Sequence, residues 1–188
     1  ENDFKTITVD GELVTVEQAN LTVTNTDDSG AGNLRDAISQ AVANSEVDVI
    51  TFDSSLSGQT ITLSSGELAI AETNGLTIDG DLDDDGTPDI TIDAGGNSRV
   101  FLIDDGDDEN AINVTLEGLT ITGGTTTGDG GGILNRENLT LSNSTVSGNS
   151  ANRGGGGISN SYGTATLSNS TVSGNSAYSS GGGIYNSY

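Results

Sequence analysis

Apolar residues alternate with polar ones in short segments through the second half of the chain. Each unit contains a Leu-Thr-Leu segment, a Thr-Val or Thr-Ile segment and a Gly-Ile-x-Asn segment, as at residues 139–141, 145–146 and 157–160. An apolar residue at every second position is typical of a half-buried β-strand, and the Gly, Asn and Ser between the segments favour turns. No segment is long enough for a helix. The pattern therefore predicts short strands joined by tight turns.

These units repeat with a nearly constant period. The segment Leu141–Ala151 recurs without a change at residues 167–177, an offset of 26, and the glycine clusters that end at three isoleucines are 25 and 26 residues apart. A period of this length with three short strands is typical of a parallel β-helix. Leucine-rich and propeller repeats are disfavoured because the units lack both a helix and an aromatic signature.

A single coil cannot bury its own apolar side chains, but coils stacked about 4.8 Å apart cover one another. Buried asparagines can then find hydrogen-bond partners in the same residue of the next coil. The glycines before each isoleucine fit corners that need a positive φ. We therefore expect four stacked pairs: Leu141 with Leu167, Val146 with Val172, Asn143 with Asn169, and Asn149 with Asn175.

The first 58 residues have a different organisation. Residues 33–44 place Leu34, Ile38 and Ala41 on one face, which predicts a helix that caps the end of the β-helix. Alternating apolar residues around Asp10 and Gly11 predict a hairpin. We therefore divide the chain into an N-terminal hairpin at residues 1–20, a capping segment at 21–58 and a parallel β-helix at 59–188. Strands are expected at residues 21–24, 49–52, 60–63, 68–70, 76–78, 90–92, 100–103 and 112–116, and some five coils fit after residue 59.

Charge divides the chain in a similar way. The sequence has 28 Asp and Glu against 5 Lys and Arg, a net charge of −23, and 25 of the acids lie in residues 1–110. Negative charge repels phosphates and anionic lipids, and no apolar run approaches the roughly 20 residues of a membrane span, so we expect neither nucleic acid binding nor membrane insertion. The absence of His and Cys excludes a Cys/His zinc site, a Ser-His-Asp triad and a thiol nucleophile.

One acidic segment has the spacing of a calcium loop. Counted from Asp81, acids stand at positions 1, 3, 5 and 9 and glycine at position 6. Alternate carboxylates can surround one hard cation, and glycine permits the sharp turn. The segment resembles the calcium loops of dockerin and thrombospondin type 3 repeats, but Ile92 stands at position 12 in place of a bidentate glutamate. We therefore expect Ca²⁺ at Asp81, Asp83, Asp85 and Asp89, with Asp79 or Asp93 as a substitute ligand; the alternative is a solvated acidic turn.

Other charged residues carry simpler expectations. The acidic run at residues 104–109 lacks the alternating spacing and is expected to be a solvated loop. Arg35 is expected to pair with a local carboxylate or to cover the coil end with its stem. Asp79 and Asp93 end neighbouring strand segments and offer the pair of carboxylates that a glycoside hydrolase needs. The regular coils have no evident general acid, so we assign no catalytic residue and lean against an enzyme.

The chain also resembles known families. The segment from Leu21 to Ile38, with its Asn-Leu-Arg-Asp-Ala-Ile motif, and the later Ile-Thr-Phe-Asp strand are similar to the entry segment of bacterial CSLREA-type proteins, although the Cys that starts their motif is missing. The Gly-Gly-Gly-Ile and Val-Ser-Gly-Asn segments resemble the repeats of polymorphic outer-membrane proteins, with Val146 and Val172 where that family has Phe. The resemblance implies a right-handed, pectate-lyase-like parallel β-helix on the bacterial exterior.

These observations favour a secreted or cell-surface structural or adhesive module that calcium stabilises. The outward residues Thr140, Thr145, Thr166 and Thr171 give it a flat polar face for glycans or for surface proteins of a host or neighbouring cell. Polysaccharide binding or degradation by a lyase or hydrolase is the alternative, because such enzymes share this fold, and ice binding is a minor one. The chain starts without Met or a signal peptide and stops within a repeat, so we expect further coils, and an anchor, beyond it.

Overall fold

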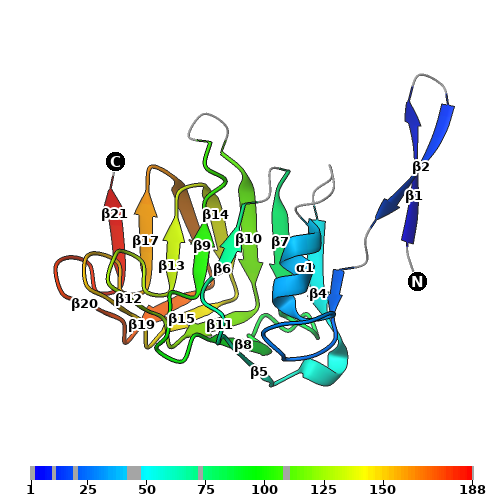
Figure 1. The fold of residues 1–188 in the computed structure, drawn as a ribbon. Helices are drawn as coiled ribbons and strands as arrows, with labels where there is room; N and C mark the ends of the chain where they lie inside the picture. Colours follow the sequence, from blue (N-terminus) through cyan, green and yellow to red (C-terminus); the bar gives the residue numbers. More distant parts are fainter. Residues whose placement is uncertain are drawn as a thin grey trace.

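The computed structural model describes residues 3–9, 12–18, 21–41, 48–71, 74–107 and 111–187. It shows a parallel β-solenoid of about six turns, with one short helix near its N-terminal end (Figure 1). The expected all-β parallel β-helix is confirmed.

Three parallel sheets run along the solenoid, and a fourth, of two-residue strands, joins them in the last three coils. Sheet 1 contains β3 (Leu21–Val23), β4 (Asp48–Phe52), β7 (Leu76–Asp79), β10 (Asn113–Glu117), β14 (Asn138–Ser142) and β18 (Thr164–Ser168). Sheet 2 contains β5 (Thr60–Thr62), β8 (Ile90–Asp93), β11 (Leu119–Thr122), β15 (Thr145–Ser147) and β19 (Thr171–Ser173). Sheet 3 contains β6 (Leu68–Ile70), β9 (Phe101–Ile103), β13 (Ile133–Asn135), β17 (Ile158–Ser161) and β21 (Ile184–Ser187). Sheet 4 contains β12 (Thr125–Thr126), β16 (Ser150–Ala151) and β20 (Ser176–Ala177).

The predicted register is confirmed. Leu141 pairs with Leu167 in sheet 1, and Val146 pairs with Val172 in sheet 2. The expected asparagine ladders also form: four residues make two side-chain bonds between coils, Asn169 Nδ2 to Asn143 Oδ1 at 3.4 Å and Asn149 Nδ2 to Asn175 Oδ1 at 3.0 Å. Because β3 and β4 belong to sheet 1, strand pairing in the solenoid begins at residue 21, ahead of the 59–188 segment assigned from sequence.

The core is a set of aliphatic columns inside the coil. Ahead of the last coil, every second residue of a strand in sheets 1 and 2 is buried, and the residues between them point outward. Ile78, Leu116 and Leu141 form one such column and are each 0% exposed. A side chain in this position is covered by the coils on both sides as well as by the opposite walls, so stacking is what removes it from water.

Glycine clusters form the corner before sheet 3. Gly155, three residues before Ile158, has a φ of +65°, in the left-handed region that glycine adopts without strain. A Cβ atom on its neighbour Gly156 would lie 2.0 Å from the Ser176 carbonyl oxygen of the next coil. Coils can therefore approach to sheet spacing at this corner only without side chains.

A helix covers the N-terminal end of the solenoid. Helix α1 (Leu34–Ala41) buries Leu34 and Ile38 and contacts β3 and β4. The Asn33 side-chain oxygen accepts a 2.8 Å hydrogen bond from the Asp36 backbone N–H, which caps the first turn. The last residues of the predicted 33–44 helix lie outside the described residues.

Two further elements complete the fold. Strands β1 (Asp3–Val9) and β2 (Glu12–Gln18) pair in antiparallel register, and the two residues between them lie outside the described residues. A 3₁₀ helix, η1 (Ser54–Leu56), follows β4 and is capped by the Asp53 side chain. The division into segments at residues 20 and 58 stays a prediction.

The repeat offers a matched test of the stacking energy. Leu141 is 0% exposed, whereas Leu167, the same residue one coil later, is 36% exposed. We expect Leu141→Ala to lower the free energy of unfolding by about 2–5 kcal/mol, and Leu167→Ala to lower it by less than half as much. Urea unfolding of both variants measures the difference. Equal losses would show that burial between coils does not stabilise the solenoid.

Candidate functional site

The acidic loop between β7 and β8 brings three of its carboxylates together. One carboxylate oxygen from each of Asp81, Asp83 and Asp89 lies within 4.8 Å of those from the other two. Asp81 is buried, Asp89 is half-buried and Asp83 is exposed. Three oxygen ligands that open to solvent on one side are a suitable partial shell for a hard cation.

Hydrogen bonds within the loop fix these carboxylates. The two Asp81 oxygens accept the backbone N–H groups of Asp85, at 3.1 Å, and Gly86, at 2.9 Å. One Asp89 oxygen accepts the Leu82 N–H at 2.8 Å, and the other accepts the Ser57 hydroxyl at 2.8 Å. The loop is thereby closed on itself and tied to the segment after η1.

The fourth predicted ligand, Asp85, lies outside this group. Its carboxylate accepts the Thr87 hydroxyl at 2.6 Å and the Thr87 N–H at 2.8 Å, and these bonds lower the pKa of Asp85. Asp79, a suggested substitute ligand, accepts the Asp81 N–H at 3.1 Å. The other substitute, Asp93, accepts the Gly95 N–H at 2.8 Å.

A hollow of about 220 Å³ adjoins the acidic loop. It is lined by Thr51, Phe52, Ser54, Asp79, Asp81, Leu82 and Asp84. Burial raises the pKa of Asp79, and the negative charges of Asp81 and Asp84 raise it further, while the bond from the Asp81 N–H opposes both. Asp79 and Asp93, the carboxylate pair considered for a hydrolase, end strands of different sheets, and Asp93 is not part of the hollow's lining.

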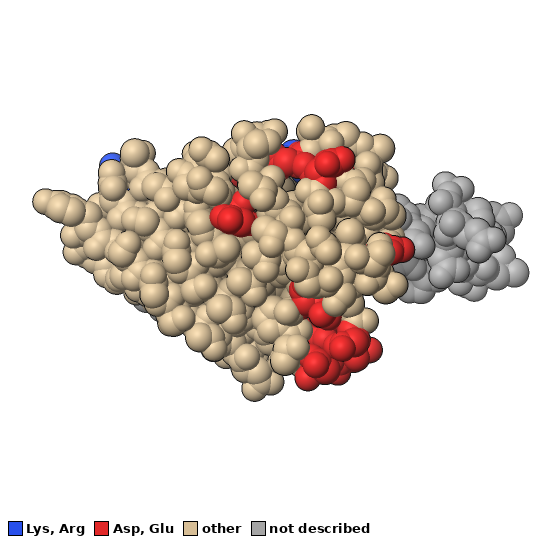
Figure 2. Space-filling view, turned by 90° about the horizontal axis from the view of Figure 1, so that it is seen from below, with Lys and Arg blue, Asp and Glu red and all other residues tan. Residues whose placement is uncertain are grey.

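The rest of the acidity gathers in the same half of the molecule. Figure 2 shows red carboxylates in patches from the centre to the right of the view, whereas the left end is almost entirely tan. This agrees with the sequence, in which residues 111–188 contain three acids and two bases. The surface of the last coils therefore consists mainly of hydroxyl, amide and apolar groups.

Outward threonines form a continuous column on sheet 2. Five threonines occupy the same register position in five coils: Thr60, Thr91, Thr120, Thr145 and Thr171. A second column two residues along each strand holds Thr62, Asp93, Thr122, Ser147 and Ser173. We call these ten residues the hydroxyl face. Sheet geometry spaces its rows about 4.8 Å apart and its two columns about 7 Å apart.

The four threonines that were expected to share one face lie on two different sheets. Thr145 and Thr171 lie on sheet 2, but Thr140 and Thr166 pair on sheet 1, because they come from the Leu-Thr-Leu segment at a different wall of the coil. Sequence analysis missed the early rows of the hydroxyl face. Thr-Ile-Thr at residues 60–62 and 120–122 was the available signal, but these coils lack the repeat that would have aligned them.

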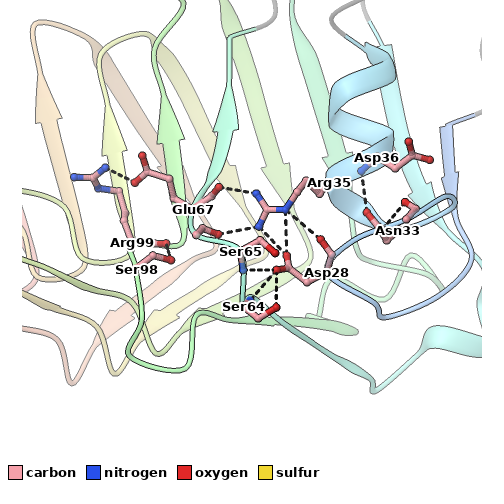
Figure 3. A network of polar contacts seen from close by, with 11 residues as sticks. Asp28, Asn33, Arg35, Asp36, Ser64, Ser65, Glu67, Ser98 and Arg99 are labelled. Atoms are coloured by element: carbon pink, nitrogen blue, oxygen red, sulfur yellow. Dashed lines mark hydrogen bonds and ion pairs between the residues drawn. The ribbon is translucent and has the colours of Figure 1, made fainter.

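A polar network links the capping helix to three successive coils (Figure 3). Arg35 donates to Asp28 Oδ1 at 2.7 Å and to the carbonyl oxygens of Gly66 and Glu67, each at 2.8 Å. The Glu67 carboxylate pairs with Arg99 at 2.6 Å, and Arg99 donates in turn to the Gly130 carbonyl at 2.8 Å. The expected pairing of Arg35 with a local carboxylate is confirmed.

Asp28 is the most strongly bonded carboxylate of this network. Its second oxygen accepts the backbone N–H groups of Ser64, at 2.8 Å, and Ser65, at 2.6 Å. Burial opposes ionisation, but the bonds from Arg35, Ser64 and Ser65 outweigh it and lower the pKa of Asp28 from 3.8 to about 2. Ser64 and Ser65 lie 36 and 37 residues beyond Asp28, so no local sequence pattern indicates these bonds.

Glu137, which sequence analysis did not select, forms hydrogen bonds with the segment between β9 and β10, which contains the acidic run at residues 104–109. It is 3% exposed, and its oxygens accept the N–H groups of Asp105, at 3.2 Å, and Ile112, at 3.0 Å. Burial raises the pKa of Glu137 despite these bonds, and the charge of Asp105 raises it further. Arg136 pairs with Asp104, so the ends of this loop are anchored, while residues 108 and 109 lie outside the described residues.

The last coil resembles a known repeat family. Residues 169–187 match the family model described as the Chlamydia polymorphic membrane protein repeat. No curated protein and no solved structure matches the chain. Together with the solenoid fold, the match supports a β-helix repeat protein. Within the described residues, no helix has both the length and the apolarity needed to cross a membrane.

The Asp28 network predicts a loss of stability in acid. A carboxylate whose pKa falls from 3.8 to about 2 on folding stabilises the native state fully above pH 4 and progressively less as the pH drops toward 2. We expect Asp28→Asn to cost about 2 kcal/mol at pH 7 and to flatten the stability profile between pH 4 and 2.

Asp27→Asn is the matched control, because the Asp27 side chain is exposed. Urea midpoints of both variants at several pH values measure the effect. If the two variants lost stability equally at pH 7, the Asp28 network would not stabilise the packing of α1 against the solenoid.

Proposed function

We propose that the chain is a surface-associated adhesive β-helix module that binds its partner through the hydroxyl face. The observation that carries this proposal is the continuous column of five threonines on sheet 2. The repeat match at residues 169–187 supports a location at a bacterial surface. The CSLREA-type resemblance agrees with that location and stays a prediction.

The chemistry of the hydroxyl face favours glycans. Nine of its ten side chains are Thr or Ser, and Asp93 is the exception. Hydroxyls both donate and accept hydrogen bonds, so a regular array can pair with the hydroxyls of a sugar polymer without a charge on either side. In the middle coils the strands that carry the array are paired on both sides. The array is therefore already ordered, and binding loses little conformational entropy.

Matched charge substitutions on two sheets test this assignment. Thr145→Arg alters the hydroxyl face, whereas Thr140→Arg places the same side chain on sheet 1 of the same coil; both threonines are half-buried. We expect the first to weaken binding to the glycans that the unmodified chain retains on an array by about 10-fold or more, and the second to leave it unchanged.

Other results would redirect the proposal. Equal losses in both variants, or no retained glycan, would contradict binding through sheet 2. Release of shortened or unsaturated sugars from a bound polysaccharide would establish an enzyme instead.

Ice is a second candidate ligand, which the same feature favours. The hydroxyl face repeats a methyl and a hydroxyl group at each threonine across five coils, at the constant spacing of a sheet. Such an array can order water on a lattice. Thermal hysteresis that disappears in Thr145→Arg would replace the glycan proposal, and its absence would remove this candidate.

We also propose that the acidic loop binds Ca²⁺ and thereby stabilises the solenoid between β7 and β8. The grouping of Asp81, Asp83 and Asp89 supports it, as does local charge: residues 79–93 contain seven Asp and no Lys or Arg. A divalent cation would relieve the repulsion among these carboxylates, which otherwise destabilises the folded loop. No calcium role is assigned to the acidic run at residues 104–109.

Substitutions within the loop distinguish the grouped ligands from the sequence spacing. We expect Ca²⁺ to raise the melting temperature by several degrees, Asp89→Asn to abolish that rise, and Asp85→Asn to preserve most of it. Calorimetric titration with Ca²⁺, with Mg²⁺ as the comparison ion, gives the affinity. Absence of both heat and stabilisation would contradict the site, and an equal loss in the two variants would restore Asp85 as a ligand.

A further inference from the structure

The hydroxyl face has a long and a short direction. Along one strand it offers two outward side chains, about 7 Å apart, whereas along the solenoid axis its columns continue through five rows, a length of about 19 Å. A chain-like ligand that lies along the axis therefore meets all ten side chains of the face, and one that follows a strand meets only two. The long direction is the one that a polymer can use.

The hydroxyls of this face are available to a ligand. Within the described residues, none of its nine Thr and Ser hydroxyls forms a hydrogen bond to another group of the chain. Hydroxyls at other walls and corners do form such bonds. Ser176 donates to the Ser150 hydroxyl of the preceding coil at 3.2 Å, and Ser170 donates to the Leu141 carbonyl at 3.1 Å. The hydroxyl face thus keeps both its donors and its acceptors for a partner outside the chain.

Sheet 1 lacks an equivalent surface. The outward column that contains Thr140 begins at Val49, which is 42% exposed. In the neighbouring column, Asp79 and Glu117 are in register and place two carboxylates side by side. An apolar residue and a pair of like charges interrupt the hydroxyls on this wall. Only sheet 2, among the walls described, carries threonine in every row of one column.

The row spacing and the flatness of the sheet define the shape of a matching polymer. In a β-1,4-linked chain of pyranose sugars the rings lie nearly in one plane, and each ring advances the chain by close to one row spacing. An α-1,4-linked chain of the same sugar curves into a helix and leaves a flat surface after a few rings. Each threonine also presents a methyl group, on which the C–H groups of a flat ring can pack while the ring hydroxyls bond to the face.

Asp93 limits the charge that a ligand on this path can carry. It is half-buried in the second row, in register with Thr62 and Thr122. One of its oxygens accepts the Gly95 N–H at 2.8 Å, which holds the carboxylate in place. No Lys or Arg stands between residues 36 and 98 to offset its charge. A sugar with a carboxylate on its ring would lie beside Asp93, and repulsion between like charges opposes its binding.

We propose that the hydroxyl face binds a neutral, extended β-1,4-linked polysaccharide along the solenoid axis, with one sugar over each coil, and that Asp93 excludes acidic sugars. This inference rests on the proposed glycan binding of the hydroxyl face and adds the shape, direction and charge of the polymer. The ten side chains of the face include no aromatic ring on which a sugar can stack, so each coil contributes a weak contact. Affinity therefore depends on the number of coils that the polymer covers.

Oligomers of one sugar in two linkages test the shape and direction of the ligand. β-1,4-linked glucose oligomers, from the dimer to the hexamer, are titrated into the full chain beside α-1,4-linked oligomers of the same lengths, and backbone amide shifts are followed by NMR. We expect affinity to rise by about 3-fold or more with each added β-linked sugar up to the pentamer, with shifts that spread along sheet 2 from coil to coil. We expect the α-linked pentamer to bind at least about 10-fold more weakly than the β-linked one.

The same β-linked pentamer, oxidised to the uronic acid form, tests the role of Asp93. We expect the oxidised pentamer to bind about 10-fold more weakly than the neutral one, and added salt to reduce this ratio. Asp93→Asn keeps the oxygen that accepts the Gly95 N–H and is expected to bring the ratio close to one. Asp84→Asn is the matched control, because it removes the same charge from an exposed residue outside the hydroxyl face. Asparagine tolerates the φ of +56° at this position, and we expect the ratio to change little.

Failure of this inference can be distinguished from failure of the proposed function. Equal affinity for the two linkages, or no dependence on length, with binding still lost in Thr145→Arg, would overturn the axial polymer and leave the hydroxyl face as a glycan site. Glycans retained on an array without binding of either oligomer series would overturn the polymer class alone. Oxidised oligomers that bind the unmodified chain as tightly as neutral ones would overturn the role of Asp93. No bound oligomer at millimolar concentration and no retained glycan would overturn both proposals.

Discussion

The structure depends on one constraint: successive coils must stack in register so that identical walls lie over one another. Leu141 and Val146 are removed from water only because the coils on both sides cover them. The same register brings the Asn149 amide to Asn175 and the outward threonines into one column. A shift by one residue would turn the apolar columns outward and break these contacts together.

Stacking also explains why charge is placed where it is. In a regular coil each side chain lies about 4.8 Å from its equivalent in the next coil, so a charged residue in the repeat would create a column of like charges. The repeats accordingly use Ser, Thr and Asn, which can bond to their own copies. Many of the acids lie between strands, as in the loop at residues 80–89, or have a specific partner, as Arg35 is for Asp28; Asp79 and Glu117, by contrast, are neighbours in register on sheet 1.

The sequence was sufficient to predict how the coils stack, because the fixed offset of the repeat gives the register directly. The pairs at Leu141 and Leu167, and at Asn149 and Asn175, follow from an 11-residue identity at a fixed offset. The acidic loop was recognisable from local spacing, but its grouping was not. Whether Asp85 turns toward Asp81 or toward Thr87 depends on competing hydrogen bonds that spacing does not determine.

Long-range polar contacts were beyond the reach of the sequence. Asp28 meets backbone N–H groups at Ser64 and Ser65 only after the chain has completed a coil, and Glu137 reaches Ile112 across one. Neither contact leaves a local pattern. The split of the threonines between sheets 1 and 2 needed the path of each coil, since both segments read as alternating strands.

The corner between sheets 3 and 1 shows how freely this architecture accepts different lengths of chain. Two residues separate β13 from β14, whereas nine separate β9 from β10, yet the strands on either side remain in parallel register. One coil later an added residue, Tyr162, is accommodated with a φ of +65° and its side chain in solvent. This corner is therefore a natural grafting position, where foreign peptides could be displayed on a rigid scaffold without disturbing the columns inside it.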